Sequence, residues 1–246
     1  NDRREIVRST IAMGTANNVR NPVGVLSMLL VQGGSALVSE AEGEYRVNLN
    51  DSPTRDGQPL QSALRFYTRF ADPTNPLYSW NRSRPNDRDA FIAGELALYF
   101  GYGSEADDIE DLNPNLNFDI AEVPQGATAS VRRTYGKFYG LALVRASQNL
   151  SGANAVRTIL GSGRIATQIA EGYTMAPPHR SELSSGSNDT YGRFIYGSAS
   201  VARGWLNPDI TETSEIFADG INDINANRIA PARAAGDMRR LLSEEY

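Results

Sequence analysis

The spacing of hydrophobic positions in the first half of the chain changes repeatedly between the period of a strand and that of a helix. Residues 5–13 predict a strand that ends at Gly14, and Val25, Leu26 and Leu29 recur at the spacing of a helix beginning near Asn21. Six further elements are expected here: β-type structure over 36–49 with a turn near 42–44, a helix over 59–70, a helix from Asn86 or Asp87 to Gly94, a strand over 96–100 covered on both faces, a polar helix over 104–112, and a strand over 117–123.

The second half of the chain has a different pattern, because helical periods dominate it. Residues 138–144 form an apolar run that predicts one more buried strand. After it, the pattern predicts only helices, over 153–160, 164–171, 191–201, 208–224 and 231–244. Strands interleaved with helices early, and helices late, indicate an α/β layered fold.

Composition narrows the class of protein. The 246 residues are 40% hydrophobic, so the chain can bury a full core as one large domain or two small lobes. The longest apolar run, 23–31, is interrupted by Gly24 and Ser27 and is much shorter than the roughly 20 residues of a membrane span, so no direct membrane insertion is expected. The chain begins at Asn1 without an initiator methionine or an apolar leader, which favours a piece of a longer protein over a processed one.

Charge and chemistry argue against nucleic-acid binding and against catalysis. The formal net charge of −5 is dispersed, whereas a nucleic-acid surface needs clustered basic residues. The chain has no cysteine, and its one histidine, His179, lies in a polar segment that suits a solvated residue. Acidic residues over 105–111 fit a solvated helix face better than a calcium site, and the calcium-loop pattern that starts at Asp223 has Arg228 where glycine is needed. We therefore predict no catalytic residue, no cofactor and no metal.

A small-solute site is the remaining chemistry that the residues support. A sugar has apolar C–H faces and a rim of hydroxyl groups, so its site combines aromatic plates with planar hydrogen-bonding side chains. Glycines at 101 and 103 would let the backbone turn sharply at the end of a strand, where ligands bind in open α/β sheets. The predicted ligand-binding residues are Asn17, Asn18, Trp80, Asn81, Gly101, Tyr102, Tyr139 and Trp205.

Each candidate also has a plainer interpretation. An aromatic residue chosen from sequence is more often part of the core than a ligand plate, and Trp80 or Tyr139 could be simply buried. Asn17 and Asn18 could instead form a turn or cap the helix that follows them. Tyr102 is the strongest candidate, because its glycine neighbours have no obvious packing purpose in the sequence.

The order of these segments resembles one family. Residues 87–125 combine a helix, a buried strand, an aromatic turn, an acidic helix and a second strand, and further similar segments are 14–18 with 25–34, 63–67, 78–81, 115–118 with 124–125, and 205–208. Together they resemble the extracellular, or periplasmic, solute-binding proteins of carbohydrate-uptake ABC transporters, the relatives of maltose-binding protein. The resemblance extends over nearly the whole chain, but most of the family's first lobe has no counterpart.

The resemblance implies a periplasmic-binding-protein-like fold of type II. Residues 1–102 and 134–246 would then belong to the second lobe, and 103–133 would be a short excursion into the first. It also implies a non-enzymatic protein that binds a small solute, with a sugar or oligosaccharide favoured, and delivers it to the membrane permease of an ABC importer. Such a protein is exported, and is periplasmic or anchored at the outer side of the cytoplasmic membrane. The alternative is an interaction or structural module that keeps the lobe fold without transport.

Overall fold

The computed structural model describes residues 8–51, 57–127, 129–187 and 189–246, and within them the chain forms two compact units. Unit 1 contains 1–101, 125–135 and 205–246, and unit 2 contains 102–124 and 136–204. The division expected from the sequence, with boundaries at 102/103 and 133/134, groups residues 136–204 with the last helices of the chain. In the structure, 136–204 belong to unit 2 and the last helices belong to unit 1. The assignment of either unit to a lobe stays a prediction. No helix among the described residues has the length and apolar character needed to cross a membrane.

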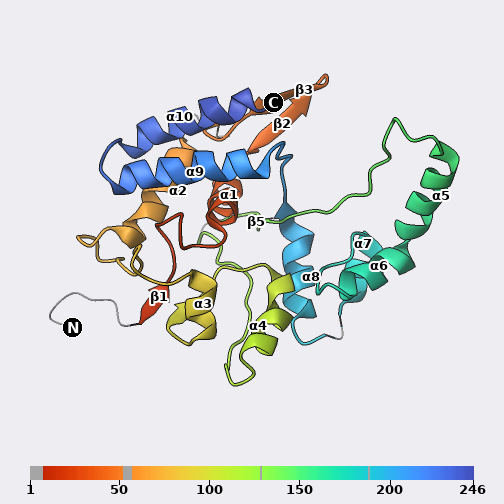
Figure 1. Ribbon diagram of the computed structural model, residues 1–246, viewed down its shortest axis with the longest axis horizontal. Coiled ribbons are helices and arrows are strands. Elements are labelled where there is room, and N and C mark those ends of the chain that lie inside the picture. The colour runs from red at the N-terminus through yellow and green to blue at the C-terminus, as the bar shows by residue number, and fades with distance from the viewer. Residues whose placement is uncertain (1–7, 52–56, 128, 188) are drawn as a thin grey trace. The chain divides into compact units, whose positions relative to one another are not determined.

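Unit 1 combines small sheets with packed helices (Figure 1). Strand β1 (Ser9–Ile11) pairs in parallel with β4 (Leu96–Leu98), and β2 (Val38–Ala41) forms an antiparallel hairpin with β3 (Glu44–Val47). The remaining elements are α1 (Pro22–Gln32), α2 (Pro59–Thr68) with the 3-10 turn η1 (Arg69–Ala71), α3 (Asp87–Ile92), β5 (Thr134–Tyr135), α9 (Ile210–Asn225) and α10 (Pro231–Glu244).

The core of unit 1 lies where helices from both ends of the sequence meet. Leu26 and Leu30 of α1, Leu64 of α2 and Phe217 of α9 are fully buried, and α10 packs along both α9 and α2. The predicted helices of this unit are confirmed, including the Asn86 cap, whose side-chain oxygen accepts a hydrogen bond from Arg88 N at 3.2 Å. The 36–49 hairpin and its turn are also confirmed.

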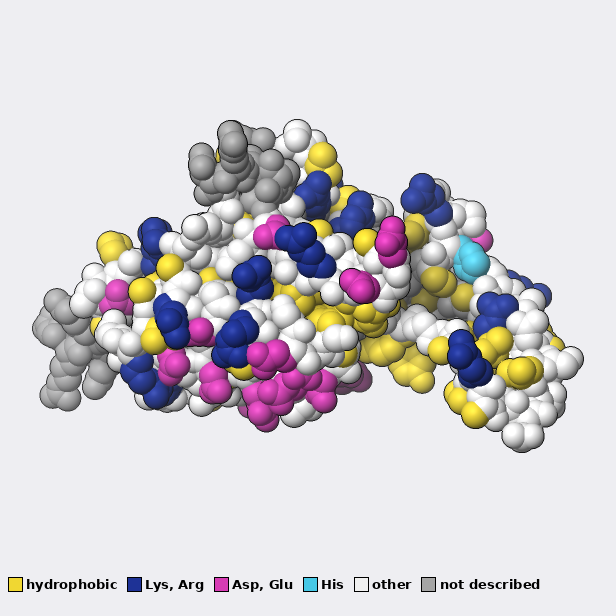
Figure 2. Space-filling view, turned by 90° about the horizontal axis from the view of Figure 1, so that it is seen from above, with side chains coloured by type: hydrophobic (Ala, Val, Ile, Leu, Met, Phe, Trp, Pro, Cys, Tyr) yellow, Lys and Arg dark blue, Asp and Glu magenta, His cyan; other side chains and the backbone are white. Residues whose placement is uncertain are grey.

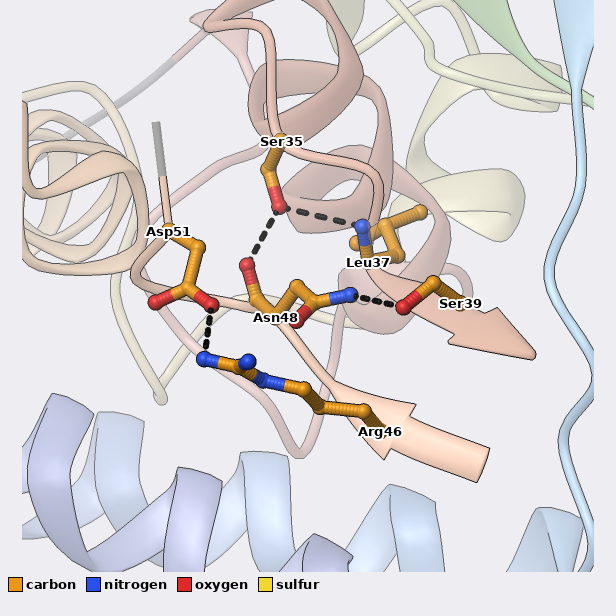
Figure 3. Close-up of polar contacts among 6 residues, drawn as sticks. All are labelled: Ser35, Leu37, Ser39, Arg46, Asn48 and Asp51. Carbon is orange, nitrogen blue, oxygen red and sulfur yellow. Dashed lines mark hydrogen bonds and ion pairs between the residues drawn. The ribbon is translucent and has the colours of Figure 1, made fainter. Parts of the chain in front are cut away.

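A small polar network closes the hairpin (Figure 3). The buried Ser35 hydroxyl donates to the carbonyl oxygen of Asn48 at 2.9 Å and accepts from Leu37 N at 3.0 Å. The Asn48 amide nitrogen donates to Ser39 Oγ at 2.7 Å, and Arg46 pairs with Asp51 at 3.2 Å. The bond from Leu37 N to Ser35 lies beside a left-handed backbone conformation at Leu37, with φ of 61°, whose side chain is buried.

Unit 2 is mainly helical and has a smaller interior. Its elements are η2 (Gly103–Glu105), α4 (Ala106–Leu112), α5 (Leu150–Leu160), α6 (Gly163–Glu171), α7 (Arg180–Ser185), α8 (Gly192–Val201) and β6 (Ala202–Arg203). Among its described residues, the buried hydrophobic side chains are only Ala106, Ile109, Ala170, Tyr191 and Tyr196, together with Pro177. Helix α7, in the segment expected to be a polar loop, was not predicted from the sequence.

Two strand predictions in unit 2 are wrong, and a third, in unit 1, is wrong in part. Residues 117–123 and 138–144 form no strand, and the second segment is exposed rather than buried. A strand needs hydrogen-bonded neighbours, which local sequence preference does not supply. The strand over 96–100 is present as β4, but it is not covered on both faces, because Leu98 is 56% exposed. The described part of the 5–13 strand is β1, and residues 5–7 lie outside the described residues.

The interior of unit 2 carries a titratable contact that should respond to alkaline pH. The Tyr191 hydroxyl donates to the Glu110 carboxylate, and Phe118 stacks on the Tyr191 ring with centroids 6.0 Å apart. This hydrogen bond, followed by desolvation, raises the pKa of Tyr191 to about 12.

We expect the neutral Tyr191 hydroxyl to stabilise unit 2 fully below pH 10, the ordinary pKa of tyrosine. Because the folded-state pKa is higher, this contribution is lost as the pH rises from about 10 to about 12. Urea unfolding of the chain at several pH values should therefore show falling stability in this window. Tyr191→Phe should make the dependence shallower, leaving the part that other tyrosines with a raised pKa, such as Tyr67, contribute, whereas Tyr139→Phe, at an exposed position, should leave it unchanged. An equal slope in the Tyr191→Phe variant would contradict this assignment.

Candidate functional site

The loop that follows β1 is held in a conformation that only glycine tolerates at its first position. Gly14 has φ of 98°, and a Cβ atom there would lie 2.6 Å from the backbone nitrogen of Ala71. The next residue, Thr15, is buried, and its carbonyl oxygen accepts a hydrogen bond from the Tyr67 hydroxyl at 2.8 Å. Burial, with Asp87 nearby, raises the pKa of Tyr67 above its ordinary value, so this hydroxyl stays a neutral donor.

Asn18 joins this loop to the segment that follows Trp80. Its amide nitrogen donates to the carbonyl oxygens of Asn81 and Arg84, each at 2.9 Å, and its amide oxygen accepts from the Thr15 hydroxyl at 2.6 Å. The prediction that Asn18 forms a turn or a cap therefore describes part of its role. The bonds also bring two segments more than 60 residues apart to one place.

The end of α9 supplies a third segment to the same place. The Asn225 amide nitrogen donates to the Gly14 carbonyl oxygen at 2.6 Å, and the Asn222 amide nitrogen donates to Asn17 Oδ1 at 3.3 Å. Arg82 donates to the side-chain oxygen of Asn222 at 2.7 Å. Amide side chains thus tie together three loops or helix ends that are distant in the sequence.

An open surface pocket of about 430 Å³, called the cavity below, lies where these segments meet, all within unit 1. Its lining is small and polar, and consists of Thr15, Ala71, Asn81, Arg82, Ser83, Asn225 and Ala226. The volume falls in the range of small-molecule sites in proteins. Arg82 is the one charged residue in this lining, and the polar side chains beside it can donate and accept hydrogen bonds, as a ligand with hydroxyl groups requires.

The hydrogen-bonding groups of the cavity are partly used by the protein itself. Asn81 donates to the Tyr78 hydroxyl at 2.7 Å and accepts from Ser83 N at 2.9 Å, so its side chain stabilises its own turn. Asn225 Oδ1 makes no hydrogen bond to another described residue and can accept one from a ligand. The last residue of α9 and its cap, Asn225 and Ala226, line the cavity, and the partial negative charge of a helix C-terminus favours hydroxyl donors over anions.

Among the other predicted residues of unit 1, the aromatic rings do not line this cavity. Trp80 is completely buried and packs in a cluster with Ala12, Val19, Ala90 and Leu96. Its ring therefore belongs to the core and has no face open to a ligand, as the plainer interpretation held. Trp205 is half-buried, and its Nε1 atom donates to Ser27 Oγ of α1 at 3.2 Å.

The glycines at 101 and 103 have packing roles that the sequence did not reveal. A Cβ atom at Gly101 would lie 2.6 Å from the Tyr99 ring, and one at Gly103 would lie 2.6 Å from Ile195. In unit 2 the Tyr102 ring is half-buried beneath Lys137, whose Nζ atom lies 4.6 Å from the ring centroid. Tyr139, also in unit 2, is 83% exposed. A ligand-binding role for Tyr102, Tyr139, Gly101 or Trp205 stays a prediction.

The structure thus brings Asn17, Asn18 and Asn81 together and adds residues that were missed: Thr15, Arg82, Ser83, Asn222 and Asn225. Asn225 appeared in the sequence only within an imperfect calcium loop, and nothing local connects it with Gly14. In the described part of the chain no group of His, Asp or Glu side chains is arranged to hold a metal ion. His179 occupies the N-cap position of α7 without a side-chain capping hydrogen bond, and its Nε2 atom lies 2.9 Å from the Gly161 carbonyl oxygen.

Comparison with known proteins identifies the fold. A crystal structure of a cyclo/maltodextrin-binding protein complexed with maltotetraose matches 99% of this chain with a TM-score of 0.68 and 17% identity. The maltose-maltodextrin binding protein of Alicyclobacillus acidocaldarius matches 95% of this chain with a TM-score of 0.66 and 13% identity. The GacH receptor of Streptomyces glaucescens, whose structure was solved unliganded and with acarbose, matches 97% of this chain with a TM-score of 0.62 and 17% identity. The predicted type II periplasmic-binding-protein-like fold is confirmed.

The match is partial in one respect. The chain spans about 60% of the length of these solute-binding proteins: 60%, 62% and 60% in the order given. No protein-family model and no curated protein matches the sequence.

Proposed function

Because the chain has the fold of maltodextrin-binding and other sugar solute-binding proteins, we propose that it binds a sugar or oligosaccharide and delivers it to the permease of an ABC importer. The proposal includes export, to the periplasm or to the outer side of the cytoplasmic membrane. It assigns no catalytic step to the chain. The proposal rests on the similarity in fold to proteins whose structures were solved with maltotetraose, acarbose and tagatose. Each of these matches covers nearly the whole of this chain.

The chemistry of the unit 1 cavity supports the proposal. Sugar hydroxyls both donate and accept hydrogen bonds, and the cavity offers guanidinium donors from Arg82, an acceptor at Asn225 Oδ1 and the carbonyl end of α9. The lining has no carboxylate that would select a cation. The interaction with Asn222 restricts the Arg82 side chain, which lowers the entropy that a ligand would have to remove.

We expect at least one sugar among maltotriose, maltotetraose, acarbose and tagatose to raise the melting temperature of the 246-residue chain. A ligand at 100 times its dissociation constant adds about 2.7 kcal/mol to the free energy of unfolding. Ala226→Trp should remove this effect, because the indole would fill the cavity without deleting a side-chain hydrogen bond. The measurement is differential scanning fluorimetry followed by calorimetric titration of any sugar that responds.

Ala230→Trp is the matched control, since Ala230 is exposed, caps α10 and does not line the cavity. It should bind sugar like the unchanged chain. No response to any sugar in the panel would count against sugar binding itself. A response that survives Ala226→Trp would instead move the sugar out of the unit 1 cavity and leave the broader proposal standing.

A further inference from the structure

The side chains that line the unit 1 cavity use most of their hydrogen-bond donors within the protein. The Thr15 hydroxyl donates to Asn18 Oδ1 at 2.6 Å, and the Ser83 hydroxyl donates to Asn81 Oδ1, also at 2.6 Å. Each hydroxyl group has a single proton, so both can only accept from a ligand. The Asn81 and Asn225 amide nitrogens also donate to the protein, to Tyr78 and Gly14. A ligand acceptor therefore finds few neutral donors in this lining.

Arg82 supplies the donors that the rest of the lining lacks. Among the described residues its guanidinium makes one hydrogen bond, to Asn222 Oδ1 at 2.7 Å, and no ion pair. A guanidinium carries its N–H groups in a planar fork, and most of them are left for a ligand here. Because the Asn222 side chain is neutral, this bond does not compensate the positive charge of Arg82.

The carboxylates nearest in sequence to the cavity lining are engaged by other groups. Asp223, just before Asn225, pairs with Arg228 at 3.0 Å. Asp72, which follows the lining residue Ala71, accepts hydrogen bonds from the backbone nitrogen and the hydroxyl of the nearby Thr74 at 2.9 and 2.8 Å. Neither carboxylate therefore neutralises the charge that Arg82 brings to the cavity.

The formal net charge of −5 does not exclude an anionic ligand, because the acidic side chains are unevenly spread. On the face drawn in Figure 2, most magenta side chains gather in one band, whereas dark-blue side chains are spread more widely. In physiological salt a charge is screened beyond roughly 8 Å, so an anion responds to the side chains around it more than to the net charge. In the cavity lining the charged side chain is Arg82.

We propose that the ligand of this cavity is a sugar acid, whose carboxylate binds Arg82 and whose hydroxyl groups face Asn225 and the end of α9. The inference rests on the proposed function and names the substrate class of that same site. A carboxylate can accept two parallel N–H bonds from a guanidinium, and such charge-assisted bonds are about twice as strong as neutral ones. Asn225 Oδ1 and the carbonyl end of α9 are acceptors, which suit the hydroxyl groups of the sugar ring.

The single positive charge also selects among anions. A carboxylate carries one negative charge, whereas a phosphate monoester carries about 1.5 to 2 at pH 7. One guanidinium balances the first but not the second, and the partial negative charge at the end of α9 would repel the excess. We therefore expect a uronic acid in preference to a sugar phosphate.

The test is calorimetric titration of the 246-residue chain with pairs of sugars that differ only at C6: glucuronate with glucose, and galacturonate with galactose. In each pair the acid has a carboxylate where the neutral sugar has a hydroxymethyl group. We expect at least one acid to bind about tenfold or more tightly than its neutral partner. Raising sodium chloride from about 0.05 M to about 0.5 M should reduce this ratio, because salt screens the attraction.

Two variants test whether Arg82 provides the preference. Arg82→Gln removes the charge, and Asn222→Asp places a carboxylate where Asn222 already contacts Arg82, so either change should bring the ratio close to one. Arg65→Gln is the matched control, since Arg65 is also an exposed arginine of unit 1 but does not line the cavity. It should retain the ratio. Far-ultraviolet circular dichroism of all three variants checks that the fold is kept.

Three outcomes would overturn the inference alone. Neutral sugars that bind as tightly as their acids would refute a sugar-acid ligand and leave the proposed function standing. A preference for the acids that survives both Arg82→Gln and Asn222→Asp would move the carboxylate away from Arg82. Tighter binding of glucose 6-phosphate than of glucuronate would identify the anion as a phosphate. Absence of binding by every sugar, neutral or acidic, would instead count against the proposed function and this inference together.

Discussion

Replacing Trp80 by alanine should lower the free energy of unfolding by about 3–5 kcal/mol, the usual cost of removing a large aromatic side chain from a core. The side chain is completely buried beside Ala12, Val19 and Leu96, and the small residues around it cannot expand to fill the space. It also lies between β1 and α3, so the loss should affect the segments that build the cavity. Urea unfolding followed by far-ultraviolet circular dichroism would measure the change.

Trp80→Phe is the informative control. The indole Nε1 of Trp80 is buried and has no hydrogen-bond partner among the described residues, so phenylalanine loses volume but no hydrogen bond. We expect this variant to lose distinctly less stability than Trp80→Ala, about 1–2 kcal/mol. If Trp80→Ala left stability unchanged but removed sugar binding, the ring would be a ligand plate and the packing seen here would be wrong.

Gly14→Ala should cost about 2–4 kcal/mol and should also remove sugar binding. The left-handed backbone at φ of 98° disfavours any side chain, and the added methyl group would approach Ala71 N to 2.6 Å and Ala71 Cβ to 2.8 Å. Because the Gly14 carbonyl accepts from Asn225, displacing the loop would also separate it from α9. Chemical unfolding measures the first effect, and calorimetric titration well below the melting temperature measures the second.

Gly43→Ala provides a control that isolates backbone strain. Gly43 has φ of 87°, close to that of Gly14, but a Cβ atom there would meet nothing within 4 Å. It should cost only about 1 kcal/mol and leave sugar binding intact. Equal losses in the two variants would mean that the close approach to Ala71 contributes nothing.

Local pattern was enough for most helices and for the hairpin. The helix over 59–70 was predicted from its apolar face, and the structure has α2 at Pro59–Thr68 with η1 after it. The helix from Asn86 was predicted from its cap, and the cap is present. Helices form from contacts three and four residues apart, and a tight hairpin from adjacent residues, so a short window of sequence contains the relevant interactions.

Strands and the site depended on contacts that no window contains. The segment over 138–144 has strand-like residues yet forms no strand, because pairing requires a partner strand. Asn17, Asn18 and Asn81 were recognised as hydrogen-bonding side chains, but the sequence did not show that Asn222 and Asn225 would reach the same loop. Trp80 was a candidate plate, and only burial could assign it to the core.

By itself, the sequence determined most of the helices, the hairpin, the absence of cysteine chemistry and a family resemblance carried by the order of segments. Tertiary structure alone decided which polar residues share a cavity, which aromatic rings are buried and which apolar segment remains uncovered. The physical reason is range: backbone conformation and helix periodicity depend on near neighbours, whereas burial and cavity lining depend on residues up to 211 positions apart, as in the hydrogen bond from Asn225 to Gly14.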